Sequence, residues 1–387
     1  MAFGLDWLSR HILYYAQIPG TTMKKMILFC IGLLVTSLAG CTEEAPQKPE
    51  RTILITIDGM TSGIHERIDM PSFSALMQEG VLYREIYLPL AAHPTQSEDY
   101  PWSCSIPNPV LMSGTIFIGQ ENVAQNLIQH SFTERPTAFT VNSGSYVAIK
   151  DGFTIYEQVP KGEMTPVYTD ELSMNAMKEI IKKDNPEFMR IHCQGLGSSG
   201  SRTKAPDMPF TDNIWHTESP WRLQAKHTDK MLGEFVQWLK DEGLWESTVL
   251  IVMGDHGQAD EGWHEPYAPG SNTTQMVVAG KDIRKGITYD YAEIIDVVPT
   301  IAWLQGVPAP KYSAGRVLNE IKEGENPPAK QSMLMKELDD VLLEYHKTVH
   351  DETDPELTIE MIARWHEGPA GANYPAFVER QVAKINE

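Results

Sequence analysis

Short apolar runs alternate along this chain with segments that carry helical spacing. The two clearest runs are Thr-Ile-Leu-Ile-Thr-Ile at 52–57 and Thr-Val-Leu-Ile-Val-Met at 248–253. Unbroken apolar runs of this length, rich in β-branched residues, are typical of parallel strands buried on both faces of a sheet. The same pattern predicts further strands at 81–90, 138–141 and 188–192.

Three segments between these runs are predicted to be helices. Pro71 begins the first and Gly80 ends it, and the third extends over 221–240. The second, over 170–183, is predicted to present one apolar face, made of Leu172, Ala176, Met177, Ile180 and Ile181. Alternating strands and helices predict an α/β fold with a central, mostly parallel sheet that helices cover on both faces.

No linker-like segment interrupts residues 51–325, which are therefore expected to form one large domain. Ahead of it, residues 42–50 combine two prolines with polar side chains, a composition that predicts a tether. Beyond it, the spacing of apolar residues is again helical. Residues 326–387 are therefore predicted to form a helical extension that packs back on the domain.

The N-terminal residues 1–41 have the features of an export signal. Met23 opens a charged segment, residues 26–38 are apolar, and the sequence Leu-Ala-Gly ends at Cys41. The apolar segment falls short of the ~20 residues that a membrane-spanning helix needs, which disfavours an uncleaved anchor helix. The residues before Met23 are interpreted as an upstream start outside the fold. The ending resembles the bacterial lipoprotein signal, and this resemblance implies an exported protein anchored to a membrane through a lipid on Cys41.

The formal net charge of −20 disfavours a nucleic-acid-binding surface, which requires clustered basic residues. An acidic chain that acts on an anionic substrate must concentrate positive charge locally. Bound metal ions are one way to do so.

Ligand-type side chains follow both of the clearest strands. Asp58-Gly59 comes directly after the first, and Gly254-Asp255-His256-Gly257 follows the second. Ligands of open α/β sheets bind beyond the carboxyl ends of the strands. If the two strands are neighbours, Asp58, Asp255 and His256 come within reach of one ion. The alternative for Asp58 is a turn residue or a helix cap.

These two motifs resemble those of the alkaline phosphatase superfamily, over roughly residues 50–320. In the phosphodiesterase/nucleotide pyrophosphatase branch, a Thr or Ser nucleophile precedes a Phe-Pro-Asn-like run, to which Ser105-Ile-Pro-Asn108 is similar. The resemblance implies an alkaline-phosphatase-like sandwich. It also implies that Ser105 is both nucleophile and metal ligand, and that Asn108 donates to a non-bridging oxygen of the substrate.

The chemistry of these residue types agrees with that assignment. A serine hydroxyl is a weak nucleophile at neutral pH and needs a base or a metal ion to activate it. A divalent ion held by the two aspartates and His256 would lower the pKa of the Ser105 hydroxyl. Aspartate and histidine ligands suit zinc, while manganese and calcium are also compatible with them. One or two ions are expected.

The resemblance breaks at the family's second metal site, an Asp-x-x-x-His segment. This chain has Gly197 where the aspartate belongs and Ser201 where the histidine belongs. His216 or His264 could replace the missing ligand, although His216 also fits a residue that merely precedes a helix. Alternatively, no second ion binds, and cationic side chains contact the substrate instead. The remaining candidates for the pocket are Arg202 and Lys204, which also fit a solvated loop, and Trp102, which fits an aromatic wall for the leaving group or a surface loop. His192 and Gln194, at the end of their strand, could also line the pocket, although an interior histidine is more often hydrogen-bonded to the backbone.

The function predicted is metal-dependent hydrolysis of a small anionic phosphate ester, above all a diester, through a phosphoserine intermediate outside the cytoplasm. One alternative is a sulfuric ester hydrolase, whose Cys/Ser-x-Pro-x-Arg motif is matched by Ser105-Ile-Pro-Asn-Pro109 except that Pro109 replaces the arginine. The other alternative is a catalytically weak surface lipoprotein that binds an anionic ligand.

Overall fold

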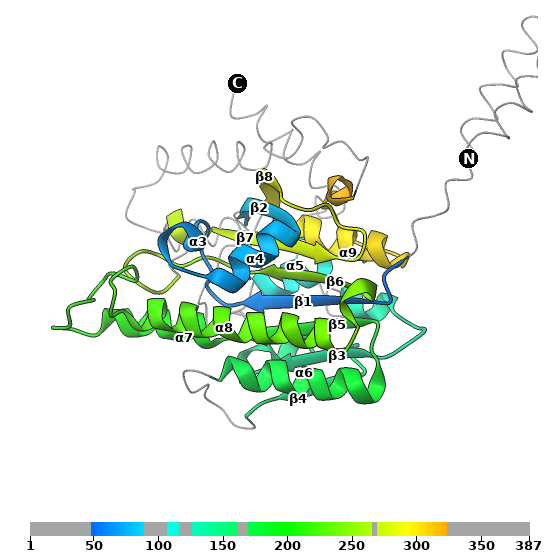
Figure 1. Ribbon diagram of the computed structural model, residues 1–387, viewed down its shortest axis with the longest axis horizontal. Helices are drawn as coiled ribbons and strands as arrows, with labels where there is room; N and C mark the ends of the chain where they lie inside the picture. Colours follow the sequence, from blue (N-terminus) through cyan, green and yellow to red (C-terminus); the bar gives the residue numbers. More distant parts are fainter. Residues whose placement is uncertain (1–47, 89–106, 116–125, 161–168, 265–268, 323–387) are drawn as a thin grey trace, which may run out of the picture. The chain divides into compact units, whose positions relative to one another are not determined.

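The computed structural model describes residues 48–88, 107–115, 126–160, 169–264 and 269–322 (Figure 1). The chain divides into two units, and the described residues all belong to the second, Lys48–Glu387. The predicted signal with Cys41, most of the tether and the C-terminal extension lie outside the described residues. Within those residues, no helix combines the length and the apolar character needed to cross a bilayer.

The described strands form one sheet in the order β4-β3-β5-β1-β6-β7-β2-β8. At its centre β1 pairs with β5 and β6, parallel to both, whereas β7 is antiparallel to β6 and β2. The predicted α/β fold with a mostly parallel sheet is confirmed. The strands are β1 (Arg51–Ile57), β2 (Gly80–Tyr87), β3 (Thr137–Val141), β4 (Ile155–Gln158), β5 (Phe188–Cys193), β6 (Thr248–Met253), β7 (Thr273–Gly280) and β8 (Ile287–Glu293).

Helices cover both faces of the sheet (Figure 1). On one face lie α4 (Pro71–Glu79), α6 (Asp170–Asp184) and α8 (Pro220–Asp241), and on the other lie α5 (Pro107–Ser113) and α9 (Val297–Gln305). Two shorter helices are α3 (Ile64–Arg67) and α7 (Gly195–Gly200). The 3-10 segments are η2 (Ile128–Ser131), η3 (Gly144–Ile149), η4 (Ser201–Lys204), η5 (Trp245–Ser247), η6 (Pro269–Ser271), η7 (Ile294–Asp296) and η8 (Asn319–Ile321).

Each central strand contributes to two apolar cores, one on each face of the sheet. In β1, Ile53, Ile55 and Ile57 pack into the core under α4, α6 and α8, while Leu54 packs into the opposite core. All seven residues of β1 are buried. The unbroken apolar run in the sequence therefore follows from burial on both faces, because successive side chains of a strand point to opposite sides.

The predicted apolar face of the helix at 170–183 is wrong at Leu172, which is 38% exposed. At 3.6 residues per turn, Leu172 lies about 140° around the helix from Met177. The buried side of α6 is centred on Met177 and includes Met174, Ile180 and Ile181. Ala176 is half-buried at the margin of this side.

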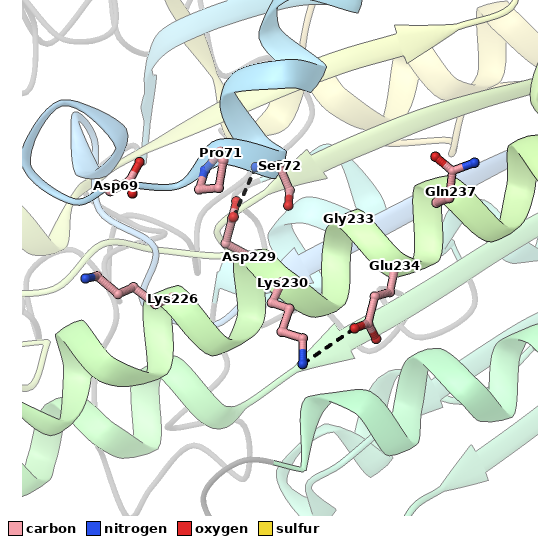
Figure 2. A pocket seen from close by; sticks show the side chains of 9 residues that line it. All are labelled: Asp69, Pro71, Ser72, Lys226, Asp229, Lys230, Gly233, Glu234 and Gln237. Atoms are coloured by element: carbon pink, nitrogen blue, oxygen red, sulfur yellow. Dashed lines mark hydrogen bonds and ion pairs between the residues drawn. The ribbon is translucent and has the colours of Figure 1, made fainter.

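The N-terminus of α4 is capped by a side chain from another helix. Met70, the residue that precedes α4, makes no capping hydrogen bond through its side chain. Asp229 of α8 instead accepts hydrogen bonds from the backbone N–H groups of Ser72 (3.0 Å) and Phe73 (2.8 Å). Helix caps of this kind contribute about 1 kcal/mol. Figure 2 shows Asp229 at an open pocket of about 480 Å³, whose lining contains none of the predicted site residues.

Candidate metal centre

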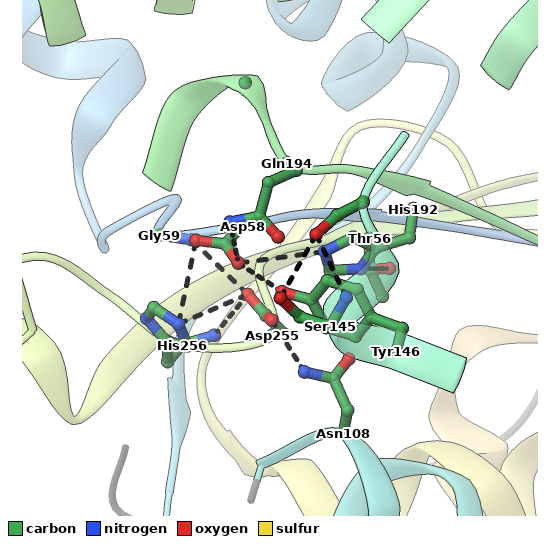
Figure 3. A network of polar contacts seen from close by, with 12 residues as sticks. Thr56, Asp58, Gly59, Asn108, Ser145, Tyr146, His192, Gln194, Asp255 and His256 are labelled. Atoms are coloured by element: carbon green, nitrogen blue, oxygen red, sulfur yellow. Dashed lines mark hydrogen bonds and ion pairs between the residues drawn. The ribbon is translucent and has the colours of Figure 1, made fainter. Parts of the chain in front are cut away.

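The register of the sheet places Asp58 opposite Asp255. Thr56 of β1 pairs with Met253 of β6, so the residues two positions further on face each other beyond the strand ends. The backbone N–H of Gly59 donates to Asp255 Oδ1 at 3.3 Å (Figure 3). The predicted meeting of the two motifs at one edge of the sheet therefore occurs.

Asp58, Asp255 and His256 form a buried group at this edge. One ligand atom from each lies within 4.8 Å of the others. His256 Nε2 is 3.8 Å from Asp58 Oδ1 and 3.9 Å from Asp255 Oδ1, and it has no hydrogen-bond partner. Two carboxylates and an imidazole nitrogen are suitable ligands for a divalent cation. The three residues therefore fit a divalent metal site.

Non-ligand groups orient His256 and Asp255 (Figure 3). His256 Nδ1 donates to the carbonyl oxygen of Gly257 at 2.7 Å, which leaves Nε2 as the free ligand atom. Asp255 Oδ1 accepts from the His256 backbone N–H at 3.0 Å, and Oδ2 accepts from Asn108 Nδ2 at 2.8 Å. Burial lowers the pKa of His256, but the Asp255 and Asp58 carboxylates outweigh it and leave the pKa above its usual value.

Asn108 is held in one orientation by Arg190. The guanidinium of Arg190 donates to Asn108 Oδ1 and also to Thr56 Oγ1, at 3.3 Å for the latter. Because arginine only donates, the amide nitrogen of Asn108 must face Asp255. Burial lowers the pKa of Arg190 to about 10, against the opposing effect of Asp255, so the guanidinium stays charged at neutral pH. It offsets part of the negative charge of the two aspartates.

Asp58 has its own set of partners. Its Oδ2 atom accepts from the hydroxyl of Tyr146 at 2.5 Å and from Gln194 Nε2 at 3.0 Å. His192 Nε2 lies 3.7 Å from the same oxygen, while its Nδ1 atom is 2.7 Å from Thr56 Oγ1. Burial lowers the pKa of His192 to about 3, so this imidazole is neutral.

The segment where the resemblance breaks provides no ligands for a second metal ion at positions 197 and 201. Gly197 lies in α7, directly against Asp58. A Cβ atom there would overlap Asp58 Oδ1 and would lie 2.5 Å from Asp58 Cγ. Ser201 is exposed and donates to the carbonyl oxygen of Ser198 at 2.9 Å. The space that an aspartate at position 197 would need is occupied by the carboxylate of Asp58.

Of the two predicted replacement histidines, one lies beside the metal group. The ring of His264 is 4.5 Å from that of His256, and its Nδ1 atom has no partner. Burial, followed by the proximity of His256, lowers the pKa of His264 to about 3. His264 is nevertheless not one of the three grouped ligands. His216 also stands outside the group, in the turn before α8, where its Nδ1 atom accepts from the backbone N–H of Glu218.

The other predicted site residues divide into exposed and undescribed ones. Arg202 and Lys204 are exposed on η4. Ser105, Trp102 and Cys41 lie outside the described residues. The roles assigned to these five residues remain predictions.

Two residues that contact the site, Tyr146 and Arg190, were not predicted from the sequence. For Arg190 a signal existed, because Arg190 and His192 alternate in a strand whose six residues are all buried. Polar side chains two apart in a strand point to the same face. For Tyr146, which lies in η3 after β3, the sequence offers no comparable signal.

Comparison with known proteins identifies the family of this chain. The sulfatase family model matches residues 115–313, just over half of the chain. GPI ethanolamine phosphate transferase 2 of Debaryomyces hansenii is 27% identical over 157 residues, which are 37% of this chain and 18% of the relative. Lipoteichoic acid synthase 1 of Bacillus subtilis is 28% identical over 108 residues, 23% of this chain and 16% of the relative. The chain thus matches less than a fifth of either relative's length.

A solved structure shares the fold. The crystal structure of a protein in the alkaline phosphatase superfamily from Vibrio parahaemolyticus superposes with a TM-score of 0.54 at 20% identity, covering 74% of this chain and 72% of the other. At this level of identity, the superposition shows that the two chains share a fold. The chain therefore belongs to the sulfatase family, and it shares its fold with a protein in the alkaline phosphatase superfamily.

Proposed function

We propose that this protein hydrolyses phosphate esters, above all diesters, with a bound divalent metal ion and with Ser105 as nucleophile. The observation that carries the proposal is the buried group of Asp58, Asp255 and His256, with Asn108 bonded to one of its members. A relative named as an ethanolamine phosphate transferase supports a phosphate ester rather than a sulfate ester.

In the proposed mechanism, the metal ligands, Ser105 and Asn108 have separate roles. A divalent ion held by the three ligands would activate the Ser105 hydroxyl and offset its repulsion from an anionic ester. The oxygen of Ser105 attacks phosphorus while the bond to the leaving group breaks, and the hydroxyl proton of Ser105 ends on the leaving oxygen, which departs as an alcohol. Water then hydrolyses the phosphoserine, which releases the phosphate product and restores the hydroxyl of Ser105. Asn108 uses one amide hydrogen on Asp255 and has a second one available for a non-bridging oxygen.

The proposed nucleophile is close in sequence to a residue of the site. Ser105 stands three positions before Asn108, the residue that donates to Asp255. Zinc is the metal that we propose, as a single ion, because Gly197 and Ser201 supply no ligand set for a second one.

The Ser105→Ala variant tests the proposal directly. Hydrolysis of aryl phosphate monoester, phosphodiester, phosphonate monoester and sulfate substrates should be compared between this variant and the unchanged chain, with zinc or manganese. We expect dominant diester or phosphonate activity that falls to background in the variant, because the nucleophile is lost. Chelation of the metal should have the same effect. Diester activity unchanged in Ser105→Ala would contradict the assignment, and silence on all four substrates would favour an anion-binding lipoprotein.

A sulfuric ester hydrolase is the second candidate, and the sulfatase family match favours it. The matched range begins at Thr115, after the proposed nucleophile, so it does not include the maturation motif of sulfatases. Pro109, buried in α5, stands where that motif has arginine. Intact-mass analysis of the peptide that contains Ser105 separates the candidates. Conversion of this serine to formylglycine would favour the sulfatase.

We also propose that the protein is exported and anchored through a lipid on Cys41. The support is the sequence Leu-Ala-Gly-Cys41 after an apolar segment. In a bacterial host, Cys41→Ser should move the chain from the membrane fraction to the soluble fraction and prevent incorporation of labelled fatty acid. A variant chain that remains equally membrane-bound and labelled would contradict this proposal.

A further inference from the structure

We propose that Tyr146 is a positioning residue for metal binding, which acts by holding the carboxylate of Asp58. This role rests on the proposed function, since it requires Asp58 to be a metal ligand. Figure 3 shows the hydroxyl of Tyr146 directed at Asp58, on the side of the carboxylate away from His256.

The two oxygen atoms of Asp58 have different surroundings. Oδ2 accepts from Tyr146 at 2.5 Å and from Gln194 at 3.0 Å, so both of its lone pairs are directed at protein donors. Oδ1 is the atom that lies 3.8 Å from His256 Nε2. Asp58 is therefore set to bind an ion through Oδ1 alone.

Packing keeps the carboxylate from turning away from this position. The α7 backbone at Gly197 lies so close to Oδ1 that a Cβ atom there would overlap it. The ring of Tyr146 lies 3.7 Å from the ring of His192, measured between centroids. Tyr146 itself is 1% exposed. The phenol therefore has little freedom to leave Asp58.

The contact between Tyr146 and Asp58 has a fixed direction. A carboxylate oxygen only accepts, so the hydroxyl of Tyr146 donates to it. Because phenol and amide are neutral groups, they fix Oδ2 without neutralising the carboxylate, whose charge stays available to the cation.

Tyr83 provides a matched control. It is another fully buried tyrosine whose hydroxyl donates to a carboxylate, Glu320 Oε1 at 2.9 Å, and neither residue belongs to the metal group. Replacement by phenylalanine at either position removes one oxygen atom and leaves the ring. Loss of a buried phenol–carboxylate bond is therefore common to both variants, whereas contact with a metal ligand is specific to Tyr146.

The test is calorimetric titration of the metal-free full-length chain with zinc chloride and, separately, with manganese chloride. For Tyr146→Phe we expect the metal dissociation constant to rise by about 10-fold or more, the usual effect of removing a group that orients a metal ligand. For Tyr83→Phe it should be unchanged. Gln194→Leu, at a partly exposed position, removes the second donor and should give a smaller rise.

The outcomes separate this proposal from the proposed function. An unchanged chain that binds neither ion would overturn both. If the unchanged chain binds metal and hydrolyses phosphate esters while Tyr146→Phe and Gln194→Leu bind the ion equally well, only the positioning role is wrong. A rise of the same size in Tyr83→Phe would also overturn it, because the effect would then be general destabilisation.

Discussion

Asp255→Asn should reduce metal affinity by at least 100-fold and bring ester hydrolysis to background. Both oxygen atoms of Asp255 act only as acceptors: Oδ1 from Gly59 and His256, and Oδ2 from Asn108. Either orientation of an asparagine at position 255 therefore directs its NH₂ group at another donor. Residues that merely orient ligands affect metal affinity about 10–100-fold, so loss of a ligand should exceed that range.

The same variant should also lose stability, because buried donors left without an acceptor cost about 1–3 kcal/mol. Asp229→Asn is the control. Asp229 is another buried aspartate whose two oxygens accept backbone N–H groups, in this case at the start of α4. Calorimetry should show reduced thermal stability in both variants and weaker metal binding in Asp255→Asn alone. Wild-type metal affinity in Asp255→Asn would exclude Asp255 as a ligand.

The second large effect is expected from Gly197→Ala. The added methyl group would overlap Asp58 Oδ1 and press on Asp58 Cγ, so either the carboxylate or helix α7 must move. Overpacking of a buried site typically costs about 1–3 kcal/mol, and displacement of Asp58 should weaken metal binding by at least 10-fold. Thermal unfolding with and without zinc measures both effects, since a ligand that binds only the folded state raises its stability.

Gly144→Ala is a suitable comparison for this variant. A Cβ atom at Gly144 would meet Gln158 Nε2 at 3.5 Å, an ordinary van der Waals contact. This change should leave metal binding unaltered. If Gly197→Ala gained as much stability from zinc as the unchanged chain does, Asp58 would not be confined in the way described. It also follows that an aspartate at position 197 cannot restore a second metal site unless Asp58 moves.

The part of the site that could be predicted from sequence depends on two strands. The strands that precede Asp58 and Asp255 are buried on both faces, so their apolar runs are unbroken and their ends are evident. The residues that follow parallel neighbouring strands meet at one edge of the sheet. Prediction of the two strands therefore brought Asp58, Asp255 and His256 together on the condition that the strands are neighbours, which the pairing of β1 with β6 confirms.

The remainder depends on contacts that no local pattern encodes. Tyr146 and Asp58 are 88 positions apart, and Arg190 and Asn108 are 82 apart. Each pair meets only after the sheet has assembled. Strands β4, β7 and β8 were not predicted. β8 alternates tyrosines with exposed polar residues at the sheet edge, and β4 has only four half-buried residues, so neither forms the apolar run that marks a central strand.

The reversed direction of β7 has a consequence for how related chains can diverge. Its first residues, rather than its last, lie beside the metal centre. Thr274 Oγ1 donates to the carbonyl oxygen of Met60 and accepts from the N–H of Gly254. The connection that leaves the centre at Gly257 therefore returns to the same edge, where Gly257 N–H donates to the carbonyl oxygen of Ser271.

A loop whose two ends are fastened together can be lengthened at low entropic cost, about 0.6 kcal/mol for each doubling of its length. Insertions or deletions between Gly257 and Ser271 would leave the register of β6 and β7 intact. This connection can thus change in length among related chains while Asp255 and His256 keep their positions.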